Sequence, residues 1–181
     1  MTSIKGKLLV AAPTLDDGTF SRAVVLGAEH SEQGAMGLVL NRPSHTLVAE
    51  SVDELGVLLE DADEAVYVGG PVQEQAVMVL AEFDDPQDSA ALVVGDVGFL
   101  PAGADMDQLA ASTRRARVFA GHAGWGPGQL DEELAEGSWI VVDAEPGDPF
   151  VDPEALWAAV LARRGGPYAV LAHPPADPSV N

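Results

Sequence analysis

The sequence predicts a mixed α/β fold in a single domain spanning residues 1–181, with a largely antiparallel sheet. Short apolar runs typical of strands are mixed with segments of helical spacing, without the regular βαβ alternation of a parallel sheet. A length of 181 residues suits one domain. We find no internal repeat and no linker that is long or polar enough to divide the chain.

The N-terminal part predicts strands that end at turn residues. A strand over 7–12 ends at Pro13, and Asp16-Asp17-Gly18 is a turn signal before a second strand over 22–29. Residues 31–34 connect it to a third strand over 36–40, which predicts a β-hairpin. We expect this strand to stop at Asn41-Arg42-Pro43, because proline cannot donate a ladder hydrogen bond.

The middle of the chain alternates between short strands and helices. Val48, Val52, Leu55 and Leu59 recur at helical spacing and predict an amphipathic helix. Residues 83–89 form an acidic loop. The further strands that we expect are 65–68, 75–82, 91–94, 97–100, 115–120 and 139–142, with helices over 106–112 and 127–136.

The final helix has signals at both ends. Asp152 is a suitable N-cap, Pro153 suits the first helical position, and Arg163 and Arg164 complement the C-terminal dipole before Gly165. The remaining residues, 167–181, are rich in proline and are expected to be extended.

Composition excludes several classes of function. The net charge of −20 repels phosphate backbones, so direct DNA binding is not expected. The absence of cysteine excludes disulfides, thiolate nucleophiles and thiolate zinc sites. No apolar run reaches the roughly 18 residues of a membrane span, and the N-terminus lacks an export signal. The sequence therefore predicts a cytoplasmic protein without membrane contact.

Several blocks of residues occur together in a characteristic order. They are 9–13, 20–25, Glu29-His30, 34–39 with Asn41 and Pro43, 67–72, 123–125, 128–130 with Glu133, Trp139 and 177–181. In these blocks the sequence resembles the YqgE/AlgH family of small bacterial cytoplasmic proteins. The resemblance covers nearly the whole chain and is weakest over 83–112. It implies a single α/β domain with a barrel-like, bifurcated sheet flanked by helices. It implies no agreed reaction, although some members carry the label of transcriptional regulator.

The glycine-rich segment 121–130 is open to two interpretations. As structure, Gly126 can cap a helix that begins at Pro127, with Gln129 at the capping-box position and Trp125 packed on Leu130. As a ligand loop, its glycines would let backbone N–H groups approach an anion. It lacks the spacing of a P-loop or a dinucleotide site, and Asp131, Glu132 and Glu133 would repel phosphate. We favour the structural interpretation.

Six residues are candidates for a ligand site. They are His30, Asn41, Arg42, His122, Trp125 and Gln129. His30 could instead be a hydrogen-bonded rim residue, and Arg42 could instead pair with a nearby carboxylate. The four histidines (His30, His45, His122 and His173) show no metal-ligand spacing, and no serine lies in Gly-x-Ser-x-Gly. We therefore predict no catalytic residue, no metal and no cofactor.

Arg114, Arg115 and Arg117 form the only basic cluster of the chain. Arg115 and Arg117 should share one face of a strand, where they could contact an anionic partner. Basic side chains also protect an edge strand from unwanted pairing, and we favour that role here.

The first functional hypothesis is a non-catalytic binding or regulatory protein that contacts a protein or a small molecule. The alternative is a low-activity enzyme, a hydrolase, with a pocket near His30, Asn41, Arg42 and His122. A cleft that joins these residues would favour the enzyme. Direct DNA binding ranks last, because no helix carries a basic face. The identity of the partner and the oligomeric state stay open.

Overall fold

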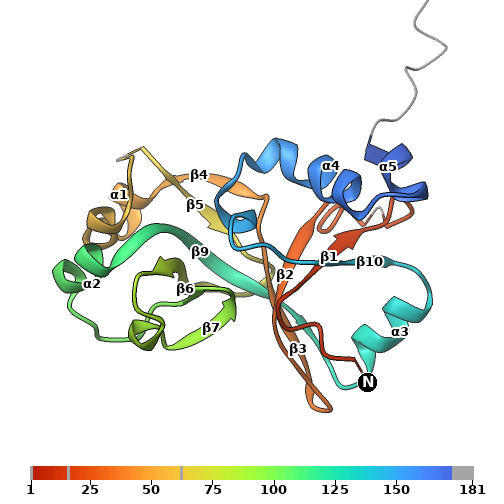
Figure 1. The fold of residues 1–181 in the computed structure, drawn as a ribbon, viewed down its shortest axis with the longest axis horizontal. Helices are drawn as coiled ribbons and strands as arrows, with labels where there is room; N and C mark the ends of the chain where they lie inside the picture. Colours follow the sequence, from red (N-terminus) through yellow and green to blue (C-terminus); the bar gives the residue numbers. More distant parts are fainter. Residues whose placement is uncertain (1, 16, 62, 173–181) are drawn as a thin grey trace, which may run out of the picture.

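A computed structural model describes residues 2–15, 17–61 and 63–172. One half of the sheet is an antiparallel series of four strands (Figure 1). They are, in spatial order, β10 (Trp139–Asp143), β1 (Lys7–Ala11), β2 (Val24–Ser31) and β3 (Gly34–Val39). The hairpin expected from the sequence is formed by β2 and β3, which pair from Val25↔Val39 to Ser31↔Gly34.

The long strand β9 (Thr113–Trp125) belongs to both halves of the molecule. Its end pairs with β3, from Gly37↔Ala123 to Ala35↔Trp125. Its earlier part pairs antiparallel with β6 (Val72–Phe83), and Phe119 and Ala120 also pair parallel with β5 (Ala65–Val68). The sheet therefore branches at β9, as the family resemblance implied.

The branched sheet stays open. From β6 it continues through β8 (Val97–Phe99) to an edge at β7 (Ala91–Val94), while β10 is the opposite edge and β4 (Pro43–Leu47) pairs with β5. The expected antiparallel α/β sheet is thus confirmed, but it does not close into a barrel.

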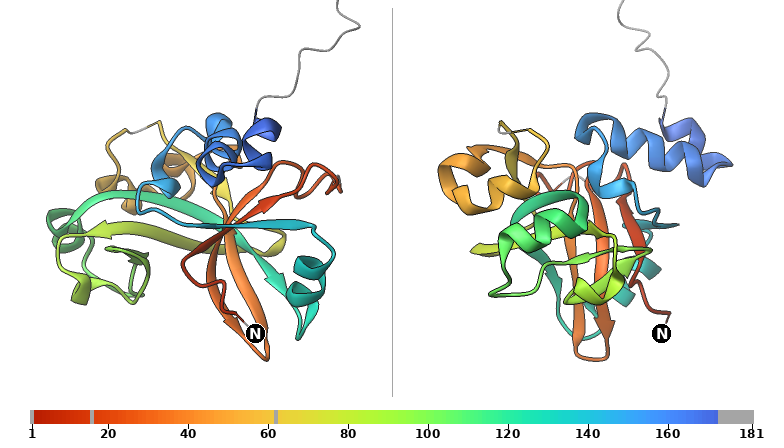
Figure 2. Two further views of the ribbon diagram at one scale, coloured as in Figure 1. Left: turned by 45° about the vertical axis from the view of Figure 1, so that its right-hand side comes forward. Right: turned by 60° about the vertical axis from the view of Figure 1, so that its left-hand side comes forward.

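Helices lie against the sheet (Figure 2), and three clusters of buried side chains join the two. The first cluster joins β1 and β2 to α4 (Pro153–Arg164), which is followed by α5 (Pro167–Ala172). The second lies on the other face of these strands, where Leu130 of α3 (Gln129–Ala135) is buried. The third packs α1 (Val48–Ser51), the 3₁₀ helix η1 (Asp53–Leu58) and α2 (Met106–Ser112) against β6 and β9. Two single-turn 3₁₀ helices, η2 (Pro86–Asp88) and η3 (Asp148–Phe150), lie in connections.

Four expectations about local structure were wrong. The helix predicted over 48–59 is interrupted at Val52, whose non-helical backbone (φ −141°, ψ 71°) separates α1 from η1. Strand β4 begins at Pro43, where we expected only a break. Strand β9 runs to Trp125, so residues 121–125 are strand and not loop. Residues 167–172 form α5 and are not extended. The rest of the predicted tail, 173–181 with His173, lies outside the described residues.

Candidate functional site

Asn41 is a buried side chain that holds the backbone of another segment. Its Oδ1 accepts the N–H of Val24 at 3.0 Å, and its Nδ2 donates to the carbonyl of Arg22 at 2.9 Å. Arg22 has a φ of +55°, in the left-handed region. This conformation costs a non-glycine residue roughly 1–2 kcal/mol, and the bonds to Asn41 offset that cost. Asn41 therefore positions Arg22.

Arg42, the next residue, is half-buried. Its guanidinium donates to the backbone carbonyl of Ser21. Within the described part of the chain, no ion pair joins it to an acid within 4.0 Å, so the carboxylate pairing that we had considered is not found. Burial lowers the pKa of Arg42, because desolvation penalises the charged form. An anion beside it would offset this penalty.

Asn41, Arg42 and Arg22 line a pocket of about 390 Å³. Helix α4 contributes further lining residues, among them Trp157 and Glu154. The guanidinium of Arg22 lies 5.1 Å above the centre of the Trp157 indole, a cation–π contact. Trp157 is fixed in turn, because its Nε1 donates to the carbonyl of Ala11 at 3.1 Å. We call this cavity the two-arginine pocket.

The two-arginine pocket suits an anion. Guanidinium groups donate in a planar fork that matches carboxylate and phosphate oxygens. Among the described residues that line the pocket, Glu154 is the only carboxylate. Arg22 and Trp157 were not predicted as site residues, because they lie far apart in sequence and no local motif connects them.

His30 and His122 do not converge. His30 pairs with Ala35 and Ala35 with Trp125, so these three residues share one face of the sheet. His122 is three residues before Trp125 on β9 and therefore lies on the other face. The His30 side chain is 2% exposed, and its Nε2 is 3.9 Å from Oδ1 of Asp131. The structure thus brings together two of the four residues of the proposed hydrolase pocket, Asn41 and Arg42.

Trp125 and Gln129 belong to a hydrogen-bonded cluster around Glu133. The indole N–H groups of Trp125 and Trp139 both donate to Oε2 of Glu133, at 2.7 and 2.9 Å. Nε2 of Gln129 donates to Oε1 of Glu133 at 3.2 Å, and Oε1 of Gln129 accepts the N–H of Gly126 at 3.0 Å. These contacts attach α3 to the sheet.

The start of α3 differs from the prediction in one detail. Its N-cap is Gly128, in the left-handed conformation, and not Gly126. Trp125 and Leu130 are buried in the same cluster, as the expected packing requires. The hollow beside Trp125 is small, about 200 Å³, and is lined partly by Glu29, Ser31 and Gln33, so it is not an apolar groove.

The three arginines of β9 are engaged within the protein. Arg114 forms ion pairs with Glu82, Asp84 and Asp96. Arg115 pairs with Glu82 at 2.9 Å and lies over the ring of Phe150. Arg117 donates to the carbonyls of Pro149 and Val151 and lies over the ring of Tyr67. At Arg115 and Arg117, strand β9 pairs with β6, whereas β5 and β3 pair with it only from Phe119 onward. The expected protection of an edge strand stays a prediction.

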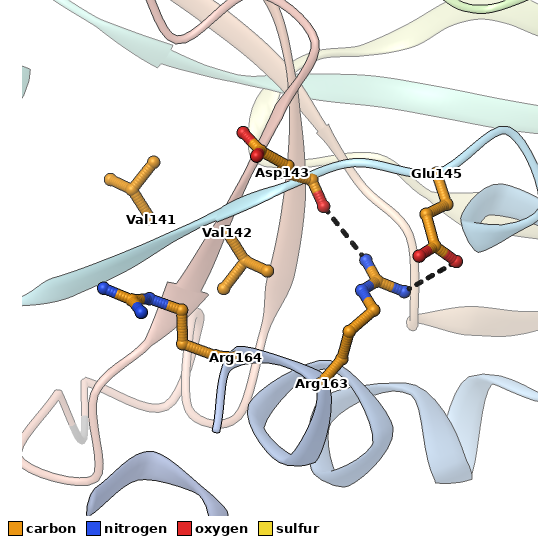
Figure 3. A pocket seen from close by; sticks show the side chains of 6 residues that line it. All are labelled: Val141, Val142, Asp143, Glu145, Arg163 and Arg164. Carbon is orange, nitrogen blue, oxygen red and sulfur yellow. Dashed lines mark hydrogen bonds and ion pairs between the residues drawn. The ribbon is translucent and has the colours of Figure 1, made fainter. Parts of the chain in front are cut away.

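A second pocket with arginines, of about 430 Å³, lies between β10 and the end of α4 (Figure 3). The guanidinium of Arg163 is engaged by groups of the protein itself. It donates two hydrogen bonds to the buried Asp148 and one to the carbonyl of Asp143, and it forms an ion pair with Glu145 at 3.3 Å. Hydrogen bonding to Asp148 raises the pKa of Arg163. The carboxylates that occupy Arg163 would repel an incoming anion, so this pocket is the weaker candidate.

The described residues contain no cluster of three or more His, Asp or Glu side chains that could hold a metal ion. Within the same residues, no helix is long and apolar enough to cross a membrane.

Comparison with known proteins identifies relatives over almost the full length. A family model described as AlgH-like matches residues 8–169. The chain is 42% identical to a UPF0301 protein of Streptomyces coelicolor over 100% of this chain and 97% of the relative. It is 37% identical to a UPF0301 protein of Chlorobium limicola, over 97% and 95% of the two chains.

Two solved structures have the same fold. Protein DIP2367 from Corynebacterium diphtheriae superposes with a TM-score of 0.87 at 30% identity, covering 95% of this chain and 93% of that one. The solution structure of the AlgH protein from Pseudomonas aeruginosa gives a TM-score of 0.72 at 32% identity, covering 97% and 96%. The similarity therefore includes both halves of the branched sheet.

Proposed function

Because this chain belongs to the AlgH-like family, we propose that it is a non-catalytic binding protein that holds a small anion in the two-arginine pocket. The ligand would carry a carboxylate or phosphate group between Arg22 and Arg42. No covalent chemistry is assigned to this pocket, and no metal or cofactor is required for it.

One observation carries the proposal: two guanidinium groups that form no ion pair with any described carboxylate share a pocket in a chain of net charge −20. Acidic side chains outnumber basic ones 29 to 9, and those of the described residues form ion pairs with Lys7, Arg114, Arg115 and Arg163. Keeping Arg22 in a left-handed conformation and Arg42 half-buried costs free energy. An anion that binds both guanidinium groups would offset this cost.

We further propose a regulatory role for the bound anion. The pocket is formed by Arg22 before β2, the β3–β4 connection, the start of β4 and helix α4, with Ala172 of α5 also among the lining residues. A ligand that bridges these elements would stabilise them relative to one another and could thereby change the contacts that they offer to a partner. In this proposal, residues 1–181 act as one domain in the cytoplasm, and DNA is not contacted directly.

The hydrolase alternative receives less support. It would need His30, Asn41, Arg42 and His122 at one site, whereas His30 and His122 lie on opposite faces of the sheet. A general base must reach the proton that it abstracts, directly or through one water.

The proposal can be tested by thermal unfolding with inorganic phosphate and with citrate as probe anions. A ligand at about 100 times its Kd stabilises a protein by about 2.7 kcal/mol, which corresponds to a rise in Tm of roughly 5–11 °C for a chain of this size. We expect this rise for the unmodified protein and its loss in Arg22→Gln and Arg42→Gln. Arg164→Gln, which removes an arginine outside the pocket, is the matched control.

Two results would refute the proposal. One is an equal response in Arg42→Gln and Arg164→Gln, which would indicate general charge screening. The other is a Glu154→Gln variant that binds anions more weakly, since removing that carboxylate should strengthen binding by up to about fivefold. Native mass spectrometry of protein purified from its own cytoplasm would then identify the ligand by its mass.

A further inference from the structure

We propose that the ligand of the two-arginine pocket is a free amino acid with an apolar side chain. This inference rests on the proposed function and names the class of ligand for the same site. The carboxylate of the ligand would lie between Arg22 and Arg42. Its ammonium group would face Glu154, the remaining charged side chain among the described residues that line the pocket.

Charges of opposite sign line this pocket without pairing with one another. In the part of the chain that the structure describes, the carboxylate of Glu154 forms no ion pair within 4.0 Å, either with Arg22 or Arg42 or with any other basic group. The three side chains nevertheless line one cavity. A ligand that carries both charges can bridge such a separation, because each of its ends forms a charge-assisted hydrogen bond.

Other contacts hold the two guanidinium groups in place. Arg22 lies 5.1 Å above the centre of the Trp157 indole, and Arg42 donates to the carbonyl of Ser21. The positive side of the pocket is therefore positioned before a ligand arrives, which lowers the cost of ordering these long side chains on binding.

The negative side of the pocket comes from the first turn of α4. Oδ1 of Asp152 accepts the N–H of Glu154 at 3.0 Å, and Pro153 is the first residue of the helix. Both signals define where the helix begins. The backbone from which the Glu154 side chain extends is thus fixed beside the pocket.

The size and the remaining lining of the pocket suit a single amino acid. Its volume of about 390 Å³ is near the lower end of the range for small-molecule pockets, about 300–1,000 Å³. Apart from Asn41 and the three charged residues, the described lining is apolar and consists of Pro43, Pro153, Trp157, Ala158 and Ala172. An aliphatic side chain of the ligand would contact this apolar surface and lose its water there.

The test is isothermal titration calorimetry of the full-length protein at neutral pH and about 0.15 M ionic strength. Three probes share one aliphatic body: leucine, isocaproate (leucine without its ammonium group) and isoamylamine (leucine without its carboxylate). We expect leucine to bind about tenfold more tightly than either of the others, because it alone makes both charged contacts. Phosphate and citrate, titrated in parallel, report on the arginines alone.

Glu154→Gln should change the affinities for two of the probes in opposite directions. Leucine should bind about tenfold more weakly, because its ammonium group loses a charged partner. Isocaproate should bind up to about fivefold more tightly, because a repelling carboxylate is gone. A purely structural role of Glu154 would weaken both. Glu132→Gln is the matched control, since Glu132 is an exposed glutamate in the first turn of α3 and does not line the pocket.

The outcomes separate this inference from the proposed function. If leucine and isocaproate bind equally while phosphate still binds, the amino-acid ligand is wrong and the anion site stands. If none of the carboxylates or phosphate binds, both are wrong. Weakening of both leucine and isocaproate by Glu154→Gln, or an equal effect of Glu132→Gln on leucine, would also overturn the inference. If Glu154→Gln does not fold, the ranking of the three probes on the unmodified protein decides.

Discussion

Glu133 is the most informative single position for the stability of the fold. It is the common acceptor of the indole N–H groups of Trp125 and Trp139, which are 7% and 5% exposed. In Glu133→Leu both donors would lose their acceptor. Each unpaired buried donor costs about 1–3 kcal/mol, so two partly buried donors should lower the free energy of unfolding by about 3 kcal/mol. For a chain of this size the corresponding decrease in Tm is roughly 6–12 °C.

The measurement is urea and thermal unfolding, followed by tryptophan fluorescence and near-ultraviolet circular dichroism. Glu132→Leu is the matched control, because Glu132 is an exposed glutamate on the same helix. Glu133→Gln should lie between the two, with a loss of about 1 kcal/mol, since an amide oxygen still accepts but carries no charge. If Glu133→Leu and Glu132→Leu unfold within about 0.5 kcal/mol of each other, the indole bonds do not secure α3.

Three further predictions concern other parts of the sheet. Asn41→Ala leaves the buried backbone groups that Asn41 satisfies without partners, and urea unfolding should show a loss of about 2–4 kcal/mol; a loss below about 1 kcal/mol would mean that water replaces the amide. Burial raises the pKa of Glu64, so the folded state holds this proton at a pH where the unfolded chain has lost it, and stability falls as pH rises through that interval. Glu64→Gln should therefore be more stable than the unmodified protein at pH 7 and indistinguishable from it below about pH 4; a difference that does not vary with pH in thermal scans would contradict this reasoning. Gly70 has a φ of +152°, and a Cβ there would lie 2.1 Å from the carbonyl carbon of His122, so Gly70→Ala should lower Tm and soluble yield by much more than Gly128→Ala, which has a positive φ but open space and should cost about 1–2 kcal/mol.

The sequence predicted the elements whose local signals agree with their burial. The β2–β3 hairpin follows from two apolar runs around a short turn. Helix α4 begins where its capping signal lies: Asp152 accepts the N–H of Glu154 at 3.0 Å, and the helix ends before Gly165. At such positions, local propensity and tertiary packing favour the same structure.

Elements that depend on distant partners were not predictable. Strand β4 has polar residues and begins with proline, and it is a strand because Pro43 and Leu47 pair with β5. The glycines of 121–125 suggested a loop, but Gly121 and Gly69 allow β9 and the segment after β5 to approach closely: a Cβ on Gly69 would lie 2.3 Å from the carbonyl oxygen of Gly121. In β4 and in residues 121–125, tertiary contacts and not local sequence determine the strand conformation.

Only part of the candidate site was predictable, because its other residues come from distant segments of the chain. Asn41 and Arg42 were suggested by their place after a strand and before proline, and the structure puts them together at a pocket. Their partners there, Arg22 and Trp157, come from segments that no periodicity relates. The roles of all six predicted ligand residues stay predictions.

The branching of the sheet at β9 has a consequence for biosynthesis. Residues 113–125 are the shared partner of strands that precede them in the chain, β3, β5 and β6. Neither half can complete its ladder until this segment has left the ribosome. Until then, backbone groups of the earlier strands lack their hydrogen-bond partners. Once residues 113–125 have emerged, both halves of the sheet would fold in the same step. Pulsed hydrogen exchange during refolding should show β3 and β6 acquiring amide protection at a common rate.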